Sequence, residues 1–97
     1  MTAQPQPEGK VFGKRLREMR EARGETLRSL ADAAGLTHPY IAEMESGRKV
    51  PSLTTLIRLA IALECEVTDL VDVFVKHDMK KLIPKGQKPA RKRTRAE

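Results

Sequence analysis

Two short apolar segments on either side of a glycine constrain this 97-residue chain more than any other feature. In the first segment Leu30, Ala31 and Ala34 recur at helical spacing, and Gly35 follows at once. Glycine adopts the left-handed backbone that ends many helices, and it does so without steric penalty. A second apolar face then includes Ile41. The sequence therefore predicts two short helices that meet at a sharp angle.

The second of these helices has its own start signals. The side chain of Thr37 can cap its first turn, and Pro39 is tolerated there because first-turn N–H groups have no partner within a helix. Ala31 is small where the two helices would cross, so their backbones can approach closely. This arrangement is typical of a DNA-binding helix-turn-helix, in which the second helix enters the major groove.

Composition favours a small all-helical bundle rather than a sheet. The aromatic residues are Phe12, Tyr40 and Phe74, so the core must be built from Leu, Ile, Val, Ala and Met. The formal net charge of +6 is uneven: residues 84–97 contain six Lys and Arg and one Glu, whereas the preceding 83 residues contain 13 basic and 12 acidic side chains. The folded part is thus nearly neutral, and the pI by itself is no evidence that the domain binds nucleic acid.

The sequence also indicates where the protein works. A single cysteine, Cys65, excludes an internal disulfide and is compatible with a reducing compartment. The N-terminus has no apolar run, and no stretch approaches the length that spans a bilayer. We therefore expect a cytoplasmic, nucleoid-associated protein that makes no membrane contact.

Composition and periodicity divide the chain into three parts. A Pro- and Gln-rich N-terminus (residues 1–9) should be disordered, residues 10–83 should form a helix-turn-helix DNA-binding and dimerisation domain, and residues 84–97 should be a basic disordered tail. Five helices are expected, and whether the last continues to Ile83 stays open. They cover about residues 10–23, 27–34, 38–45, 53–63 and 67–75. The fourth places Leu53, Leu56, Ile57, Ala60 and Leu63 along one stripe.

The run LADAAGLTHPYIAEMESGRKVPSLTTLIRLAIAL resembles the Cro/C1-type (XRE) helix-turn-helix regulators of bacteria and their phages and plasmids. A small residue, the turn glycine, Tyr-Ile, Glu-Ser-Gly and Pro-Ser-Leu all fall at the expected offsets, and the resemblance covers residues 11–74. It implies an all-α, five-helix, lambda-repressor-like domain that binds an inverted repeat as a homodimer. Some positions depart from the family: Leu27 replaces a common glutamine, Glu64 replaces a common glycine, and Cys65 stands where relatives usually have an aliphatic residue. For Cys65 the resemblance therefore implies a buried structural thiol rather than a redox switch.

One face of the predicted reader helix is nearly bare of large apolar groups. It consists of His38, Pro39, Ala42 and Glu43. In the resembling family the matching positions contact bases. His38 can donate or accept at a purine edge, and Glu43 can accept from a cytosine amino group. Pro39, where many relatives have a polar residue, would contact a thymine methyl group. The alternative is that His38 and Glu43 are ordinary exposed side chains.

Side chains around this helix are candidates for phosphate contacts. They are Arg28, Thr37, Tyr40, Ser46, Arg48 and Lys49. In relatives a glutamine at the position of Leu27 holds a phosphate, and Arg28 can substitute for it here. The alternative for Arg48 and Lys49 is a solvated charged loop. The basic tail is either a solubilising end or an arm that adds phosphate contacts or enters a minor groove.

The resemblance also implies a salt bridge between Arg20 and Glu45. In the family these positions form a partly buried pair that ties the first helix to the reader helix, a role that suits the two-pronged guanidinium of arginine. The alternative is two independent surface charges. We expect dimerisation to use the last helix and the residues after it, because the sequence leaves no other spare apolar surface. The residues concerned are Val71, Phe74, Val75 and Ile83.

These observations favour a sequence-specific transcription regulator, most simply a repressor, whose partner is double-stranded DNA. An enzyme is not expected, because isolated histidines and the lack of metal-ligand spacing or a phosphate-binding glycine loop leave no catalytic, metal or cofactor site. The main alternative is an antitoxin or accessory subunit that binds an unknown protein partner and DNA only secondarily. A non-specific nucleoid protein is a third reading, which the near-neutral core disfavours.

Overall fold

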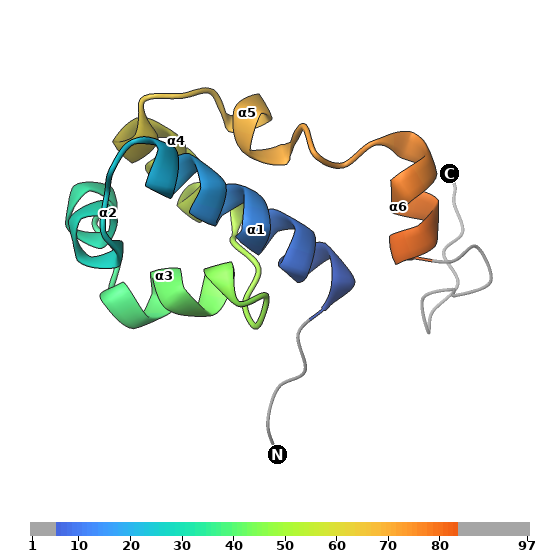
Figure 1. Ribbon diagram of the computed structural model, residues 1–97, viewed down its shortest axis with the longest axis horizontal. Helices are drawn as coiled ribbons and strands as arrows, with labels where there is room; N and C mark the ends of the chain where they lie inside the picture. Colours follow the sequence, from blue (N-terminus) through green and yellow to red (C-terminus); the bar gives the residue numbers. More distant parts are fainter. Residues whose placement is uncertain (1–5, 84–97) are drawn as a thin grey trace, which may run out of the picture.

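A computed structural model describes residues 6–83 of the chain. Over this range the protein is all-helical, as predicted, and contains six helices (Figure 1). These are α1 (Pro7–Ala22), α2 (Leu27–Ala34), α3 (His38–Glu45), α4 (Leu53–Leu63), α5 (Val67–Val71) and α6 (Lys76–Leu82). Helices α1 to α5 pack into one bundle, and α6 stands beside it (Figure 1). None of the described helices is both long and apolar enough to cross a bilayer.

Short polar side chains begin the central helices. The hydroxyl oxygens of Thr26, Thr37 and Ser52 accept hydrogen bonds from backbone N–H groups three residues later, at 2.9, 3.2 and 3.1 Å. Ser29 completes a reciprocal cap at the start of α2, because its hydroxyl accepts from the Thr26 N–H at 2.9 Å. These caps are local, so they place three helix starts within one residue of where the sequence predicts them.

The core lies where α1 to α5 meet. Its completely buried members come from all five helices: Leu16, Leu30, Ile41, Met44, Leu59 and Leu70. The first helix packs most closely on α3. A Cβ added at Gly13 would overlap the carbonyl oxygens of Met44 and Glu45, and one added at Gly9 would lie 2.6 Å from the Gly47 oxygen. Glycine at both positions therefore lets the α1 backbone rest directly on the end of α3.

The close contact at Gly9 explains one correction. Residues 7–9, expected in a disordered terminus, form the first turn of α1, which begins three residues before Lys10. Pro7 occupies the first turn, where its missing N–H costs nothing. The backbone N–H of Gln6 also donates to the Gly47 oxygen at 3.3 Å. The remainder of that terminus, residues 1–5, and the predicted basic tail, residues 84–97, lie outside the described residues.

The apolar stripe predicted on α4 is only partly buried. Leu59, Ala60 and Leu63 face the core, but Leu53 and Ile57 are 68% and 46% exposed. With Ile61, which is 71% exposed, they form an aliphatic outer face of α4. The helix is rotated because Thr55 takes a core position, where its hydroxyl bonds with those of Ser52 and Tyr40 at 3.1 and 3.3 Å.

The C-terminal segment forms two short helices where the sequence predicts one. The fifth helix does not extend to residue 75 but ends at Val71, and a separate sixth helix follows, so the expected count of five was one short. Valine at positions 71, 73 and 75 disfavours a continuous helix because the branched side chain is restricted at χ1. Phe74 instead packs back on the core, and Val75 adopts an extended backbone before α6 begins.

Candidate nucleic-acid interface

The outer face of α3 presents the four residues predicted to contact bases. His38 and Pro39 are exposed, and Ala42 and Glu43 are half-buried at the sides of the helix. On the opposite face Ile41 is completely buried in the core. Helix α3 lies along one edge of the bundle, with its outer side turned away from α1 (Figure 1). The structure thus leaves this face open to a ligand.

The turn between α2 and α3 has the geometry that its glycine predicts. Gly35 ends α2 with a left-handed backbone, at φ +70°. The N–H of Leu36 donates to the Ala31 oxygen at 2.9 Å and closes the last turn of α2. Thr37 then caps α3, as described above. These local bonds fix the direction in which α3 leaves α2.

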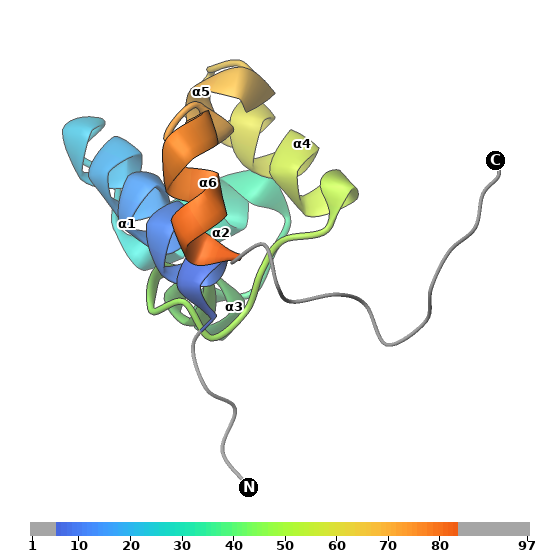
Figure 2. The same cartoon turned by 90° about the vertical axis from the view of Figure 1, so that its right-hand side faces the viewer.

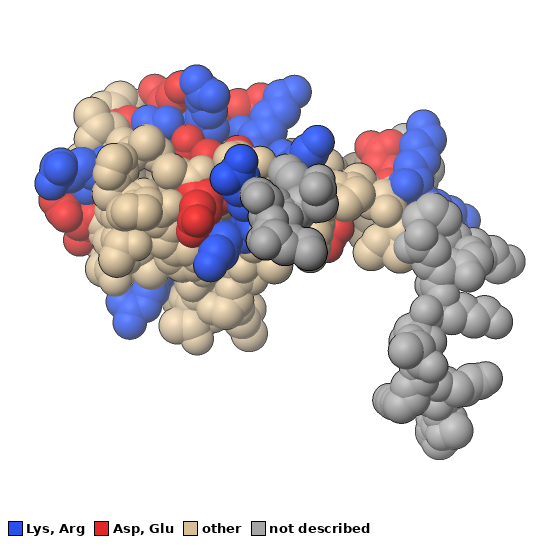
Figure 3. Space-filling view, turned by 90° about the horizontal axis from the view of Figure 1, so that it is seen from below, with Lys and Arg blue, Asp and Glu red and all other residues tan. Residues whose placement is uncertain are grey.

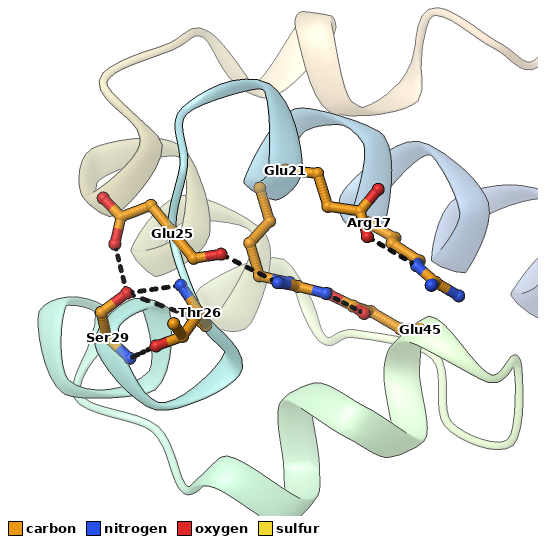
Figure 4. A network of polar contacts seen from close by, with 7 residues as sticks. Arg17, Glu21, Glu25, Thr26, Ser29 and Glu45 are labelled. Atoms are coloured by element: carbon orange, nitrogen blue, oxygen red, sulfur yellow. Dashed lines mark hydrogen bonds and ion pairs between the residues drawn. The ribbon is translucent and has the colours of Figure 1, made fainter.

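A buried ion pair joins α3 to α1. The Arg20 guanidinium donates through Nε to Glu45 Oε2 at 2.6 Å and through Nη2 to Oε1 at 3.0 Å (Figure 4). The two side chains are only 11% and 9% exposed. Hydrogen bonding to Glu45 raises the pKa of Arg20, more than its burial lowers it, so the guanidinium stays charged. The two-bond geometry sets both the position and the rotation of the end of α3.

The same guanidinium reaches the start of α2. Arg20 Nη1 donates to the backbone oxygen of Glu25 at 2.8 Å, and the Glu25 carboxylate accepts from the Ser29 hydroxyl at 2.6 Å (Figure 4). Since Ser29 belongs to the cap of α2, one side chain of α1 links the starting turn of α2 to the end of α3. The turn at Gly35 therefore fixes the end of α2 against the start of α3, and Arg20 links the start of α2 to the end of α3.

This geometry agrees with the comparisons to known proteins. The helix-turn-helix family profile matches residues 16–70. The chain belongs to the Cro/C1-type helix-turn-helix family. The family is one of DNA-binding regulators and not of enzymes.

Relatives and solved structures support this assignment. The HTH-type transcriptional regulator DdrOP3 of Deinococcus deserti is 45% identical over 58 residues, which are 60% of this chain and 45% of that protein. The restriction-modification controller protein C.AhdI of Aeromonas hydrophila has a TM-score of 0.64 and 38% identity over 65% of this chain and 96% of its own. SinR, solved in complex with DNA, has a TM-score of 0.60 and 29% identity over 63% of this chain and 98% of its own. The chain spans about half the length of the first curated relatives it matches, with 45%, 59% and 48% of three of them covered.

Most of the predicted phosphate contacts surround α3 in this helix-turn-helix domain. Arg28, Thr37, Arg48 and Lys49 are exposed. Ser46 is exposed too, and its hydroxyl donates to the Glu43 oxygen at 2.9 Å. Lys49 Nζ lies 3.9 Å from the Glu43 carboxylate, so a predicted phosphate contact neighbours a predicted base contact.

Tyr40 has a structural role in addition to the predicted one. Its ring is half-buried against the core, and its hydroxyl bonds with that of Thr55 at 3.3 Å. A phosphate oxygen only accepts hydrogen bonds, so a phosphate contact requires the Tyr40 hydroxyl to accept from Thr55 and to keep its own O–H for the phosphate. The helical pattern alone did not indicate the bond, because Thr55 lies on a different helix.

Sequence reasoning missed Arg17. Arg17 is one of the residues that line an open pocket of about 320 Å³ beside α3. The others are Arg20, Leu27, Ala42, Glu45 and Ser46. Arg17 Nε donates to Glu21 at 3.0 Å, and the Arg17 side chain is 64% exposed. Arg17 lies three residues before Arg20 on α1, so both side chains are on the same face of that helix. This spacing could have indicated that Arg17, like Arg20, lies beside the reader helix.

The charge around the motif is dispersed. Seen from the α3 side, the described surface is largely uncharged, with separate Lys and Arg side chains around it instead of one continuous basic patch (Figure 3). This agrees with the near-neutral composition of the folded part. Binding to DNA would then depend on a few placed contacts more than on a strong general field.

The predicted dimerisation residues divide into two pairs. Val71 and Phe74 are half-buried and pack against the core, whereas Val75 and Ile83 are 41% and 58% exposed. The expectation that the chain has no other exposed apolar surface was wrong, because the outer face of α4 is a second one.

Proposed function

We propose that this chain is a sequence-specific transcription regulator, most simply a repressor, that binds an inverted-repeat operator in double-stranded DNA as a homodimer. The observation that carries this proposal is the open outer face of α3 on a helix that the buried Arg20–Glu45 pair holds in place. The likeness to SinR, solved in complex with DNA, supports it. A rigid helix with a polar and small outer face suits entry into the major groove.

Base recognition in this proposal comes from four residues of α3. His38 and Pro39 enter first, because they form the N-terminal turn of the reader helix. His38 bonds to a purine edge, and Glu43 accepts from a cytosine amino group. Pro39 and Ala42 make apolar contacts with thymine methyl groups. Such a set gives sequence preference without a strongly basic surface.

Phosphate contacts fix the register of α3. Thr37 and Tyr40 act from one end of the helix, Ser46, Arg48 and Lys49 from the other, and Arg28 from the first turn of α2. Arg17 adds a contact through the pocket beside Leu27 and Ala42. Each cationic contact releases a counterion, so the affinity falls with salt in proportion to their number.

Repression follows from occupancy. Two copies related by a twofold axis read half-sites whose centres are about one DNA turn apart, roughly 10 base pairs. A dimer bound across a promoter excludes other proteins from it.

The first experiment is footprinting on DNA flanking the gene, followed by anisotropy titration of the protected site. Glu43→Ala should lose about 1–3 kcal/mol of discrimination at one base pair of each half-site. Glu18→Ala, an exposed change on α1, is the matched control and should leave the preference unchanged. A chain that shows no preference among duplexes at physiological ionic strength would refute the proposal.

Salt dependence separates phosphate contacts from base contacts. Arg48→Ala should reduce the slope of log affinity against log salt by about 1, while the order of preferred sites stays the same. A chain truncated after Ile83 tests the basic tail in the same assay. A smaller slope assigns the tail a phosphate contact, and an unchanged slope removes it from the interface.

A further inference from the structure

An apolar groove lies on the side of the bundle away from the Arg20–Glu45 pair. It has a volume of about 180 Å³, and α1, α4, α5 and the segments adjoining α4 and α5 contribute to it. Its apolar lining includes Phe12, Val50, Leu56, Val71 and Phe74. Glu8 is the charged member of the described lining. A groove of this size accommodates an aliphatic side chain, since cavities of about 150 Å³ bind a molecule as large as benzene.

Helix α6 has an apolar face that is not packed on its own bundle. Val75, Met79 and Leu82 recur at helical spacing, and Val75 and Met79 are 41% and 45% exposed. Ile83 follows and is 58% exposed. The close helix pairs of the bundle do not include α6, which projects beside it (Figures 1 and 2). A helix of seven residues is unstable alone in water, so this face requires a partner.

The path of the chain argues against α6 of the same copy as that partner. Phe74 lines the groove, and only Val75 separates it from α6. Val75 begins α6 with an extended backbone, at φ −99° and ψ +157°, and α6 then lies beyond α5 at the side of the bundle (Figure 1). A return to the same groove would require the chain to reverse within one residue. A second copy meets no such constraint.

We propose that two copies exchange α6, so that Met79 and Leu82 of each copy fill the groove of the other. This inference rests on the homodimer in the proposed function and names the surface through which it forms. Charge supports the pairing, because exposed Lys80 and Lys81 flank the apolar face of α6 and Glu8 lines the groove. A twofold axis covers both grooves with one type of contact, as a closed dimer requires.

The first experiment measures dimerisation of the full chain by sedimentation equilibrium. Met79→Glu places a carboxylate in the groove and should raise the dimer dissociation constant about 100-fold. Ile61→Glu is the matched control: it makes the same change on the outer face of α4 and should alter the constant by less than about threefold. Equal effects, or a larger effect of Ile61→Glu, would overturn the exchange.

A second experiment distinguishes exchange from folding back. The change Cys65→Ser removes the native thiol, and the changes Val50→Cys and Met79→Cys place one thiol at the groove and one on α6. After mild oxidation with diamide at low protein concentration, exchange gives a covalent dimer on a non-reducing gel. A monomer with an internal disulfide, or no disulfide at all, would contradict it.

These measurements are made without DNA, so the two proposals can fail separately. If the wild-type chain dimerises through α6 but shows no sequence preference on DNA, the exchange stands and the regulator proposal fails. If the chain prefers its site but Met79→Glu leaves the dimer intact, the exchange fails and the regulator proposal stands.

Discussion

The two sides of α1 are built differently. Toward α3 the helix presents Gly9 and Gly13, where the two backbones are in close contact. It also presents Arg20, which forms an ion pair with Glu45; their side chains are 11% and 9% exposed. Toward α5 it presents Arg15, which donates to the backbone oxygen of Asp69 at 2.8 Å and to the Asp72 carboxylate at 2.9 Å. The side chains of the Arg15–Asp72 ion pair are 28% and 54% exposed. An open groove lies beside that second side. The protein therefore fixes its reader helix rigidly and leaves its C-terminal helices room to meet a partner.

The largest test of this difference is Glu45→Gln. The change leaves the Arg20 guanidinium buried without its counter-charge and should lower the free energy of unfolding by about 3 kcal/mol. Asp72→Ala removes the exposed pair, leaves the Arg15 bond to the Asp69 backbone oxygen in place, and should cost less than about 1 kcal/mol. Urea denaturation measures both. Unchanged stability of Glu45→Gln together with altered site choice on DNA would show that the pair recognises DNA instead of aligning α3.

Gly13→Ala tests the backbone contact on the same side. The added methyl group meets the carbonyl oxygens of Met44 and Glu45, so α1 and α3 must separate. We expect a loss of about 2 kcal/mol. Lys14→Ala, an exposed neighbour on α1, is the control and should have little effect on the urea midpoint. A fully stable Gly13→Ala variant would mean that the two helices are not in close contact.

Glu64→Gly tests the turn before α5. Glu64 has a left-handed backbone at φ +56°, a conformation that disfavours a residue with a side chain. Glycine should raise the free energy of unfolding by about 0.5–1 kcal/mol. Glu64→Ala retains the left-handed cost and removes the carboxylate, which lies 3.8 Å from Arg23, so it should not stabilise. If both variants gain equally, removal of the carboxylate and not relief of the backbone is the cause.

The smallest effect concerns Cys65, which lies beside α5. Burial raises the pKa of its thiol, and nearby Asp69 and Glu66 raise it further. Since the folded chain disfavours the thiolate, the stability contributed by Cys65 is present at neutral pH and is lost as the pH rises above the pKa of the unfolded thiol. Alkylation with iodoacetamide should therefore have a higher pH midpoint in the native chain than in urea. Equal midpoints would indicate that the core does not shield the thiol.

Much of the motif could be predicted from residues close together in the sequence. Gly35, Thr37 and Ser52 determine helix ends through bonds within one turn, and the structure places those bonds as expected. The ion pair between Arg20 and Glu45 required the family resemblance, because the residues lie 25 positions apart. The assignment of base and phosphate contacts to individual residues rests on the resemblance and on the open face of α3, and it stays a prediction.

Local patterns by themselves thus determined that this chain is helical, where its caps and turn lie, and which residues α3 turns outward. Tertiary packing decided which side of α4 faces the core, where α1 begins and that the fifth helix stops at Val71. The physical reason is the range of the forces involved. A cap is satisfied by an N–H three residues away, whereas burial depends on which distant side chains compete for the same volume. Thr55 can be buried in the core because its hydroxyl forms hydrogen bonds with the hydroxyls of Tyr40 and Ser52. The apolar pattern of α4 does not indicate these bonds.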